Sequence, residues 1–141
     1  MKLLLDSNIV LWLIYQPERV HSRAAELLAT LEYERLISDV SLLEITLKLQ
    51  KGKLEYTANL QNFLTRLEDL AATPLPLTRE HILASVQLPQ LHADPFDRLL
   101  IAQAQIERAV LVTADATIRE SDYEVDTMWS YLRTWHDPHA V

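Results

Sequence analysis

Short apolar segments that alternate with stretches of helical period are the feature that most constrains the fold of this chain. Leu3–Leu5, Leu36–Ser38 and Val110–Thr113 are too short to form helices, and the segments between them carry apolar residues at helical spacing. Strands that are separated by helices pair in parallel, with helices on both faces of the sheet. We therefore predict an α/β protein, a three-layer α/β/α sandwich around a central, mainly parallel sheet.

The other elements are predicted from periodicity and from capping residues. Gly52 is placed to end a helix over 42–51, Thr78 to begin a helix over 79–87, and Asp94 with Pro95 to begin a helix that runs to about residue 108. The remaining predictions are helices over 9–15, 24–31 and 60–70, a short strand bracketed by Pro74 and Pro76, a short helix opened by Asp115, and a last strand over 125–128.

Composition removes several classes of function. The chain has 141 residues, no cysteine and a single glycine, which excludes disulfides, thiol catalysis, Cys-based zinc sites and glycine-rich phosphate loops. Its 20 acidic and 13 basic residues give a formal net charge of −7, which is untypical of a protein that coats DNA. No segment reaches the roughly 18 apolar residues that span a bilayer. We expect the mature protein to begin at Met1 and to act in the cytoplasm.

Four acidic residues lie just after predicted strands or in the first turn of a predicted helix: Asp6, Glu44, Asp97 and Asp115. Each has a local explanation, because Asp6 and Asp115 could cap the helices that follow, Ser41 with Glu44 has the capping-box pattern, and Asp97 suits the positive end of its helix.

The joint placement of these four acids carries more weight than any one of them. Because the carboxyl ends of parallel strands meet at one edge of a sheet, their carboxylates would converge there and repel one another unless a cation neutralises them. Mg²⁺ and Mn²⁺ prefer oxygen ligands, and such ions support in-line displacement at phosphorus. The cluster therefore favours a metal-dependent enzyme of phosphoryl chemistry over simple capping.

Four motifs resemble those of PIN-domain ribonucleases, and most closely the VapC-type toxins of bacterial type II toxin–antitoxin pairs. They are the segments Leu3–Asn8, Ser41–Ile45, His92–Ala104 and Val112–Asp115, in this order along the chain. The resemblance covers residues 1–128 as the PIN domain, with 129–141 as a C-terminal extension of the same domain. It implies an α/β/α fold, a Mg²⁺ or Mn²⁺ site, endonucleolytic cleavage of RNA, inhibition by a cognate antitoxin protein, and a homodimer.

By position, the resemblance assigns catalysis and metal binding to Asp6, Glu44, Asp97 and Asp115. Asp6 and Asp97 would be the main metal ligands, Glu44 would complete the site or orient a water, and Asp115 would act directly or through water.

Four further residues are candidates for positioning the substrate. Ser7 carries a hydroxyl that can bond a carboxylate or a phosphate, and Thr113 can steer Asp115 or a metal-bound water. Arg98 can contact a phosphate or pair with the carboxylates. Asp94 either supports the metal ligands without binding the metal itself, or serves only as the N-cap of its helix.

Two groups of residues have both a functional and a structural interpretation. Lys48, Lys51 and Lys53 can follow an RNA backbone, or they form a solvated helix end where cations suit the dipole. The aromatic residues near the C-terminus can stack on bases or pack on a partner, or they seal the end of the sheet or a dimer surface. These aromatic residues are Trp129, Tyr131 and Trp135.

The sequence thus predicts a metal-dependent endoribonuclease that is the toxin of a toxin–antitoxin pair. One alternative is a catalytically silent PIN-like module that binds RNA or protein. The other is a structure-specific DNA nuclease, which the short chain disfavours because it leaves little room for a clamp on DNA.

Overall fold

A parallel sheet forms the centre of the protein. The computed structural model describes residues 1–54, 59–89, 94–115, 127–131 and 134–135. Five strands run parallel in the order β3-β2-β1-β4-β5, and β6 joins β5 antiparallel at the edge. The strands are β1 (Lys2–Leu5), β2 (Glu34–Ser38), β3 (Thr73–Leu75), β4 (Val110–Thr113), β5 (Thr127–Tyr131) and β6 (Thr134–Trp135). The predicted parallel sheet is confirmed.

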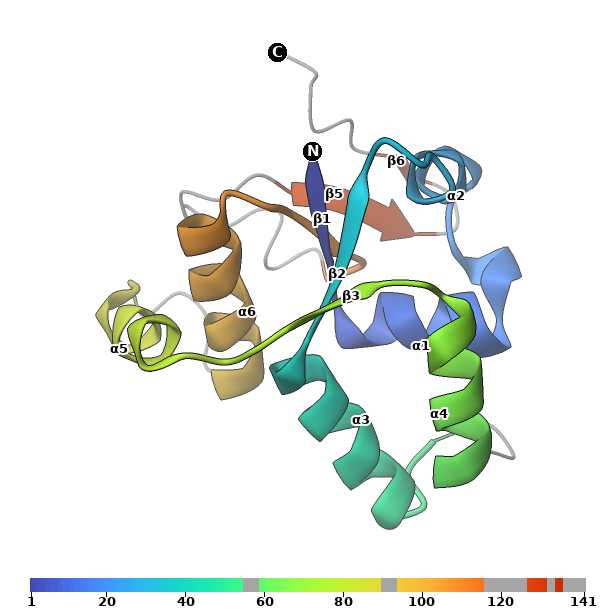
Figure 1. Ribbon diagram of the computed structural model, residues 1–141, viewed down its shortest axis with the longest axis horizontal. Coiled ribbons are helices and arrows are strands. Elements are labelled where there is room, and N and C mark those ends of the chain that lie inside the picture. The colour runs from blue at the N-terminus through green and yellow to red at the C-terminus, as the bar shows by residue number, and fades with distance from the viewer. Residues whose placement is uncertain (55–58, 90–93, 116–126, 132–133, 136–141) are drawn as a thin grey trace.

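Helices cover both faces of this sheet, as predicted. Figure 1 shows α5 and α6 on one side and α1, α2 and α4 on the other. The helices are α1 (Ser7–Tyr15), a 3₁₀ turn η1 (Pro17–Arg19), α2 (Ser22–Leu28), α3 (Asp39–Gln50), α4 (Leu60–Asp69), α5 (Arg79–Gln87) and α6 (Pro95–Glu107). Within the described ranges, no helix combines the length and apolarity that a bilayer crossing requires.

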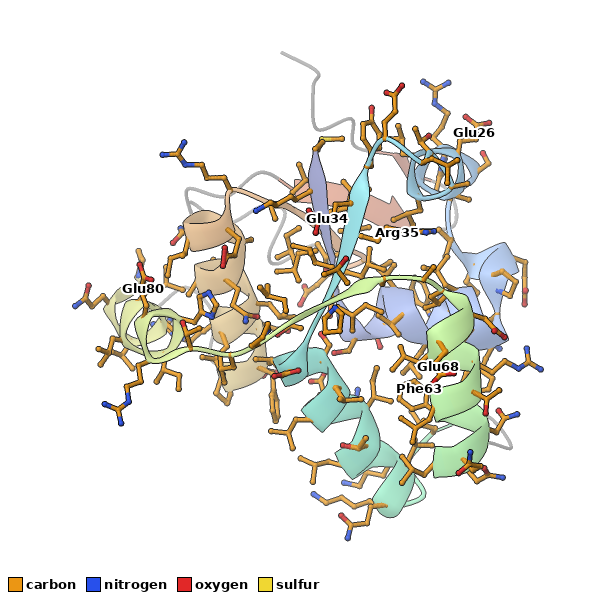
Figure 2. All side chains as sticks on the ribbon, in the orientation of Figure 1. Glu26, Glu34, Arg35, Phe63, Glu68 and Glu80 are labelled. Atoms are coloured by element: carbon orange, nitrogen blue, oxygen red, sulfur yellow. The ribbon has the colours of Figure 1, made fainter. Side chains whose placement is uncertain are left out.

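Two apolar cores lie on opposite faces of the sheet because successive strand residues point to opposite sides. Leu3 and Leu5 belong to the core under α1, α2 and α4, whereas Leu4 belongs to the core under α5 and α6. Phe63 is fully buried in the first core, which it reaches from α4 (Figure 2). Burying a side chain of this size stabilises the fold by about 1.5–3 kcal/mol, so the two cores hold the helices on the sheet.

Hydrogen bonds confirm three of the predicted helix boundaries. Gly52 adopts a φ of 64° just after α3, and its N–H donates to a carbonyl of the last turn. The Thr78 hydroxyl accepts from the His81 N–H at the start of α5. The Asp94 carboxylate accepts from the Phe96 N–H at 2.9 Å and caps α6. Local capping chemistry therefore sets these boundaries.

The predicted extent of the second helix is wrong. α2 ends at Leu28, and Leu31, which the periodicity assigned to its apolar face, is 95% exposed. Arg35 extends from β2 toward α2 (Figure 2), and its Nη1 donates to the Leu28 carbonyl at 3.1 Å. The end of the helix is thus set by a bond from a strand, which periodicity does not reveal.

The capping box predicted for the third helix is also wrong. The Ser38 hydroxyl accepts from the Val40 N–H at 3.0 Å, so α3 begins directly after β2, at Asp39. Ser41 therefore lies inside the helix and is fully buried. The helix starts early because the last residue of the strand is itself a good N-cap. The helix predicted after Asp115 falls on residues 116–126, outside the described residues.

A buried polar network joins α6 to the start of α3. The Gln103 side chain is fully buried, its Oε1 accepts from Ser38 Oγ at 2.5 Å, and its Nε2 lies 3.3 Å from His81 Nδ1. His81 Nδ1 also accepts from the Thr78 N–H at 3.0 Å, and His81 Nε2 lies 3.5 Å from Glu107 Oε1. The network fixes the capping hydroxyl of α3 relative to α6.

Replacing Gln103 by Leu is expected to lower the free energy of unfolding by about 1–3 kcal/mol, because it leaves buried polar groups without partners. Urea denaturation measures this loss. Gln105→Leu, on the same helix but only half-buried, is the matched control and should change stability by less than about 0.5 kcal/mol. Equal effects of the two substitutions would contradict a stabilising network at Gln103.

Candidate acidic site at the sheet edge

Asp6 occupies the N-cap position of α1, but its carboxylate does not cap the helix. Its N–H donates to the Val112 carbonyl at 2.9 Å, which continues the sheet pairing one residue beyond β1. The side chain is 6% exposed, and its Oδ2 accepts from Thr113 Oγ1 at 2.7 Å. The predicted capping role of Asp6 is therefore wrong: the carboxylate is held toward the end of β4.

A single hydroxyl organises this end of the sheet. Thr113 is fully buried; its Oγ1 donates to Asp6 and accepts from the Asp115 N–H at 3.0 Å. The two bonds use the donor and one acceptor position of the hydroxyl, so its orientation is determined. Thr113 thus positions the side chain of Asp6 and the backbone of Asp115, and its role in positioning substrate stays a prediction.

The charges of three acidic residues act on one another at this site. The pKa of Asp6 is raised from 3.8 to about 6, mainly because burial disfavours its charged form. The bond from Thr113 lowers this pKa, whereas the negative charges of Glu44 and Asp115 raise it further. Asp6, which follows β1, therefore lies close enough to Glu44 of α3 and to Asp115 after β4 for their charges to interact, and their joint role in a site stays a prediction.

The fourth predicted acid, Asp97, lies in the first turn of α6 and is half-buried. The start of α6 lies beside the start of α3 in Figure 1, and the two helices are in contact. Asp94, three residues earlier, uses its carboxylate to cap α6. Its capping role is confirmed, and the catalytic role of Asp97 stays a prediction.

Arg98 makes hydrogen bonds that the sequence did not suggest, and its predicted contact with a phosphate or with the carboxylates stays a prediction. Its guanidinium is 9% exposed and donates three hydrogen bonds of 2.8 Å, to the carbonyls of Ser85, Leu88 and Pro89. These carbonyls lie at and just after the end of α5, where helix carbonyls lack partners of their own. Arg98 therefore ties the end of α5 to α6, and this accounts for its position beside Asp97.

Two buried hydroxyls near the acids have no hydrogen-bond partner within the described ranges, those of Ser7 and Ser41. Ser7 follows Asp6 directly, and Ser41 precedes Glu44 by one turn of α3. An unsatisfied buried hydroxyl is costly, so each of these two groups is available to bond a water or a ligand atom. Ser7 was predicted; Ser41 was missed because its sequence pattern suggested a cap.

The donor set of the site fits a hard divalent cation. Carboxylate oxygens are the ligands that Mg²⁺ and Mn²⁺ prefer, and the two hydroxyls can bond waters or phosphate oxygens around such an ion. In the described part of the chain, no group of three or more acidic or histidine side chains is already close enough to enclose an ion. Burial first, and then the charges of Glu44 and Asp115, raise the pKa of Asp6, and a cation bound among these residues would offset the repulsion.

Because the pKa of Asp6 is raised in the folded state, ionisation of Asp6 lowers the free energy of unfolding. With a pKa of 3.8 when unfolded and about 6 when folded, the folded state binds the proton more tightly. The contribution of Asp6 to stability is therefore greatest below pH 3.8 and declines as the pH rises to about 6. The decline is about 3 kcal/mol, at about 1.4 kcal/mol for each unit of pKa.

Replacing Asp6 by Asn is expected to raise the free energy of unfolding by about 2–3 kcal/mol at neutral pH in EDTA, because the amide still accepts from Thr113 without carrying charge. Below about pH 4 the difference should disappear. Urea denaturation across this pH range measures it, with the exposed Asp69→Asn as control. An Asp6→Asn protein no more stable than wild type at neutral pH would show that the buried charge carries no cost.

Comparisons with known proteins agree with this architecture. The sequence matches the model of the PIN domain family over residues 3–122. Among curated proteins, none matches the chain in sequence.

Solved structures of low sequence identity share the fold. VapBC2 from Rickettsia felis, bound to a DNA fragment from its promoter, superposes with a TM-score of 0.69 at 21% identity and covers 92% of this chain and 99% of that chain. DNA-bound VapBC from Salmonella typhimurium gives 0.66 at 17%, covering 90% and 96%. A toxin–antitoxin complex from Klebsiella pneumoniae gives 0.58 at 22%, covering 80% and 86%.

Proposed function

Because this chain belongs to the PIN domain family, a family of nucleases, we propose that it is a divalent-metal-dependent endoribonuclease and the toxin of a toxin–antitoxin pair. The observation that carries the proposal is the buried carboxylate of Asp6, whose pKa is raised to about 6 by burial and by the charges of Glu44 and Asp115. A protein retains such mutual repulsion where a cation offsets it during function.

The four acids have distinct roles in this proposal. Asp6 and Asp97 are the main ligands of a Mg²⁺ or Mn²⁺ ion, Glu44 completes the site, and Asp115 acts directly or through water. The ion supplies Lewis acidity for the attack of water on a phosphodiester and for the departure of the leaving oxygen. Thr113 holds the Asp6 carboxylate in place through its 2.7 Å bond, so that less reorganisation is needed when the ion binds.

The buried Ser7 hydroxyl is proposed to position the substrate. It has no protein partner among the described residues and can donate to a phosphate oxygen of the RNA. Arg98 has a structural role in this proposal, because its guanidinium donates to carbonyls at and just after the end of α5.

The proposed partners are an antitoxin protein and a second copy of the chain, with the complex acting in the cytoplasm. Structures that share this fold include the toxin–antitoxin complexes named above. α5 carries three apolar side chains that are 44%, 63% and 68% exposed, those of Ile82, Leu83 and Val86. A contiguous apolar face of this kind is typical of a surface that another chain covers.

Purified wild-type protein is expected to cleave end-labelled RNA with Mn²⁺ or Mg²⁺ and to be inactive in EDTA. Asp97→Asn should lower the cleavage rate by at least about 100-fold, because it removes the charge of a main metal ligand. The assay uses transfer RNA, single-stranded RNA and single-stranded DNA, resolved on gels. Asp69→Asn, an exposed acid on α4, is the matched control and should cleave like wild type.

Other outcomes of the cleavage assay favour the alternatives. Binding of RNA without cleavage by any variant would favour a catalytically silent module, and cleavage confined to DNA would favour a DNA nuclease. Equal cleavage by wild type and Asp97→Asn would indicate a contaminating nuclease.

Mn²⁺ should also raise the melting temperature of the metal-free protein, because it binds the folded state preferentially. At about 100 times its dissociation constant the gain is about 2.7 kcal/mol, or roughly 5–10 °C for a chain of this length. Asp97→Asn should reduce the shift without lowering the stability of the metal-free form, whereas Asp69→Asn should shift fully. Calorimetry measures these melting temperatures. If Mn²⁺ raises the melting temperature of Asp97→Asn as much as that of wild type, Asp97 is not a metal ligand.

A further inference from the structure

A pocket lies between α1 and α3, and these two helices also lead to the acidic site. It has a volume of about 420 Å³, and three of its lining side chains are cations: Arg19, Lys48 and Lys53. Asn8 and Trp12 of α1 line it as well, with two leucines completing the wall. No acidic residue of the described part of the chain lines it. We call it the basic pocket.

The cations of the basic pocket, Arg19, Lys48 and Lys53, form no ion pair with a carboxylate of the described residues. This holds although the chain has 20 acidic residues against 13 basic ones. Glu44 precedes Lys48 by four residues on α3, a spacing at which helix ion pairs form, and still the two are not paired. Three like charges around one pocket repel one another, so an anion bound between them would relieve a cost.

Two neighbouring side chains fix the orientation of the Arg19 guanidinium. Its guanidinium carbon lies 4.5 Å from the centroid of the Trp12 ring, and its Nη1 donates to Gln16 Oε1 at 3.2 Å. Stacking on an indole fixes the plane of the guanidinium and leaves its edge available for hydrogen bonds. Less side-chain entropy is then lost when a phosphate binds.

The basic pocket adjoins the acids through two elements. Asn8 lies two residues after Asp6 on α1, and Lys48 lies about 6 Å beyond Glu44 along α3, at 1.5 Å for each helical residue. A polymer that crosses the acids at one phosphate therefore reaches the basic pocket with a neighbouring part of its backbone.

We propose that the basic pocket binds a backbone phosphate of single-stranded RNA, on one side of the bond that is cleaved; this rests on the proposed function. Arg19 contacts the phosphate through its guanidinium edge, and Lys48 and Lys53 contribute point charges. The acidic site and the basic pocket then have different roles. The acids hold the cation at the bond to be cleaved, and the pocket sets the direction in which the RNA strand crosses the acids.

The test measures RNA binding in EDTA, so that binding is seen without cleavage. The anisotropy of a short fluorescein-labelled single-stranded RNA is titrated with wild type, Lys48→Gln, Lys53→Gln and Arg19→Gln at several salt concentrations. Lys51→Gln is the matched control, because Lys51 carries the same charge on the same helix end but does not line the pocket. Circular dichroism and melting temperatures verify that each variant is folded.

Each pocket variant is expected to raise the dissociation constant about fivefold, and the slope of log K against log salt should fall by about 0.7 for each phosphate that the variant no longer binds. Lys51→Gln should leave both close to wild type. Equal effects of Lys51→Gln and the pocket variants would overturn the proposal, because they would show attraction by net charge alone.

A labelled oligoglutamate peptide is the second probe. If wild type binds it, the pocket variants fail to bind it, and RNA binding is unchanged in those variants, then an acidic protein segment occupies the pocket and the proposal is overturned.

Failure of the pocket and failure of the nuclease are distinguishable. RNA binding that depends on the pocket, without cleavage in Mn²⁺, would refute the nuclease and support the pocket. Cleavage with unchanged KM in all three pocket variants would refute the pocket alone. A raised KM with little change in kcat supports it, since a contact that is equal in the ground and transition states affects binding only.

Discussion

An ionised carboxylate taken out of water loses hydration that the protein must replace, and in this fold that cost falls on Asp6. The side chain is 6% exposed, and burial is the largest cause of its raised pKa. The Thr113 hydroxyl offsets part of the cost through a 2.7 Å bond and also accepts from the Asp115 N–H. β1 and β4 are paired neighbours in the sheet, so this contact joins residues 107 positions apart. The geometry of the acidic edge depends on it.

The rest of the fold presents further acids to this edge. α3 begins directly after β2, where Ser38 caps the helix and Gln103 of α6 holds the capping hydroxyl. The same two helices carry Glu44 and Asp97. Arg98 then ties α6 to the end of α5 through three carbonyls. The Ser38 hydroxyl thus caps the start of α3, and the Asp94 carboxylate caps the start of α6.

Particular elements show how far sequence reasoning reaches. Gly52, Thr78 and Asp94 were correctly placed at helix ends, because capping depends on neighbours within a few residues. Leu31 and Ser41 were misjudged, because the end of α2 and the start of α3 depend on Arg35 and Ser38 in the strand β2. Four of the basic pocket's side chains are Trp12, Arg19, Lys48 and Lys53; the sequence suggested only its lysines, since helix α1 and the turn after it complete the pocket in space.

The sequence by itself determined the order of strands and helices and the parallel sheet, and it led to the prediction that acids gather at the carboxyl edge of that sheet. These follow from apolar periodicity and from the geometry of parallel strands, which are local or general rules. Only the tertiary structure decided that Asp6 is held by Thr113 rather than capping α1, that Arg98 serves the end of α5, and that the hydroxyls of Ser7 and Ser41 are buried without partners in the described residues. Each of these depends on which atoms distant parts of the chain bring together, and residue spacing does not contain that information.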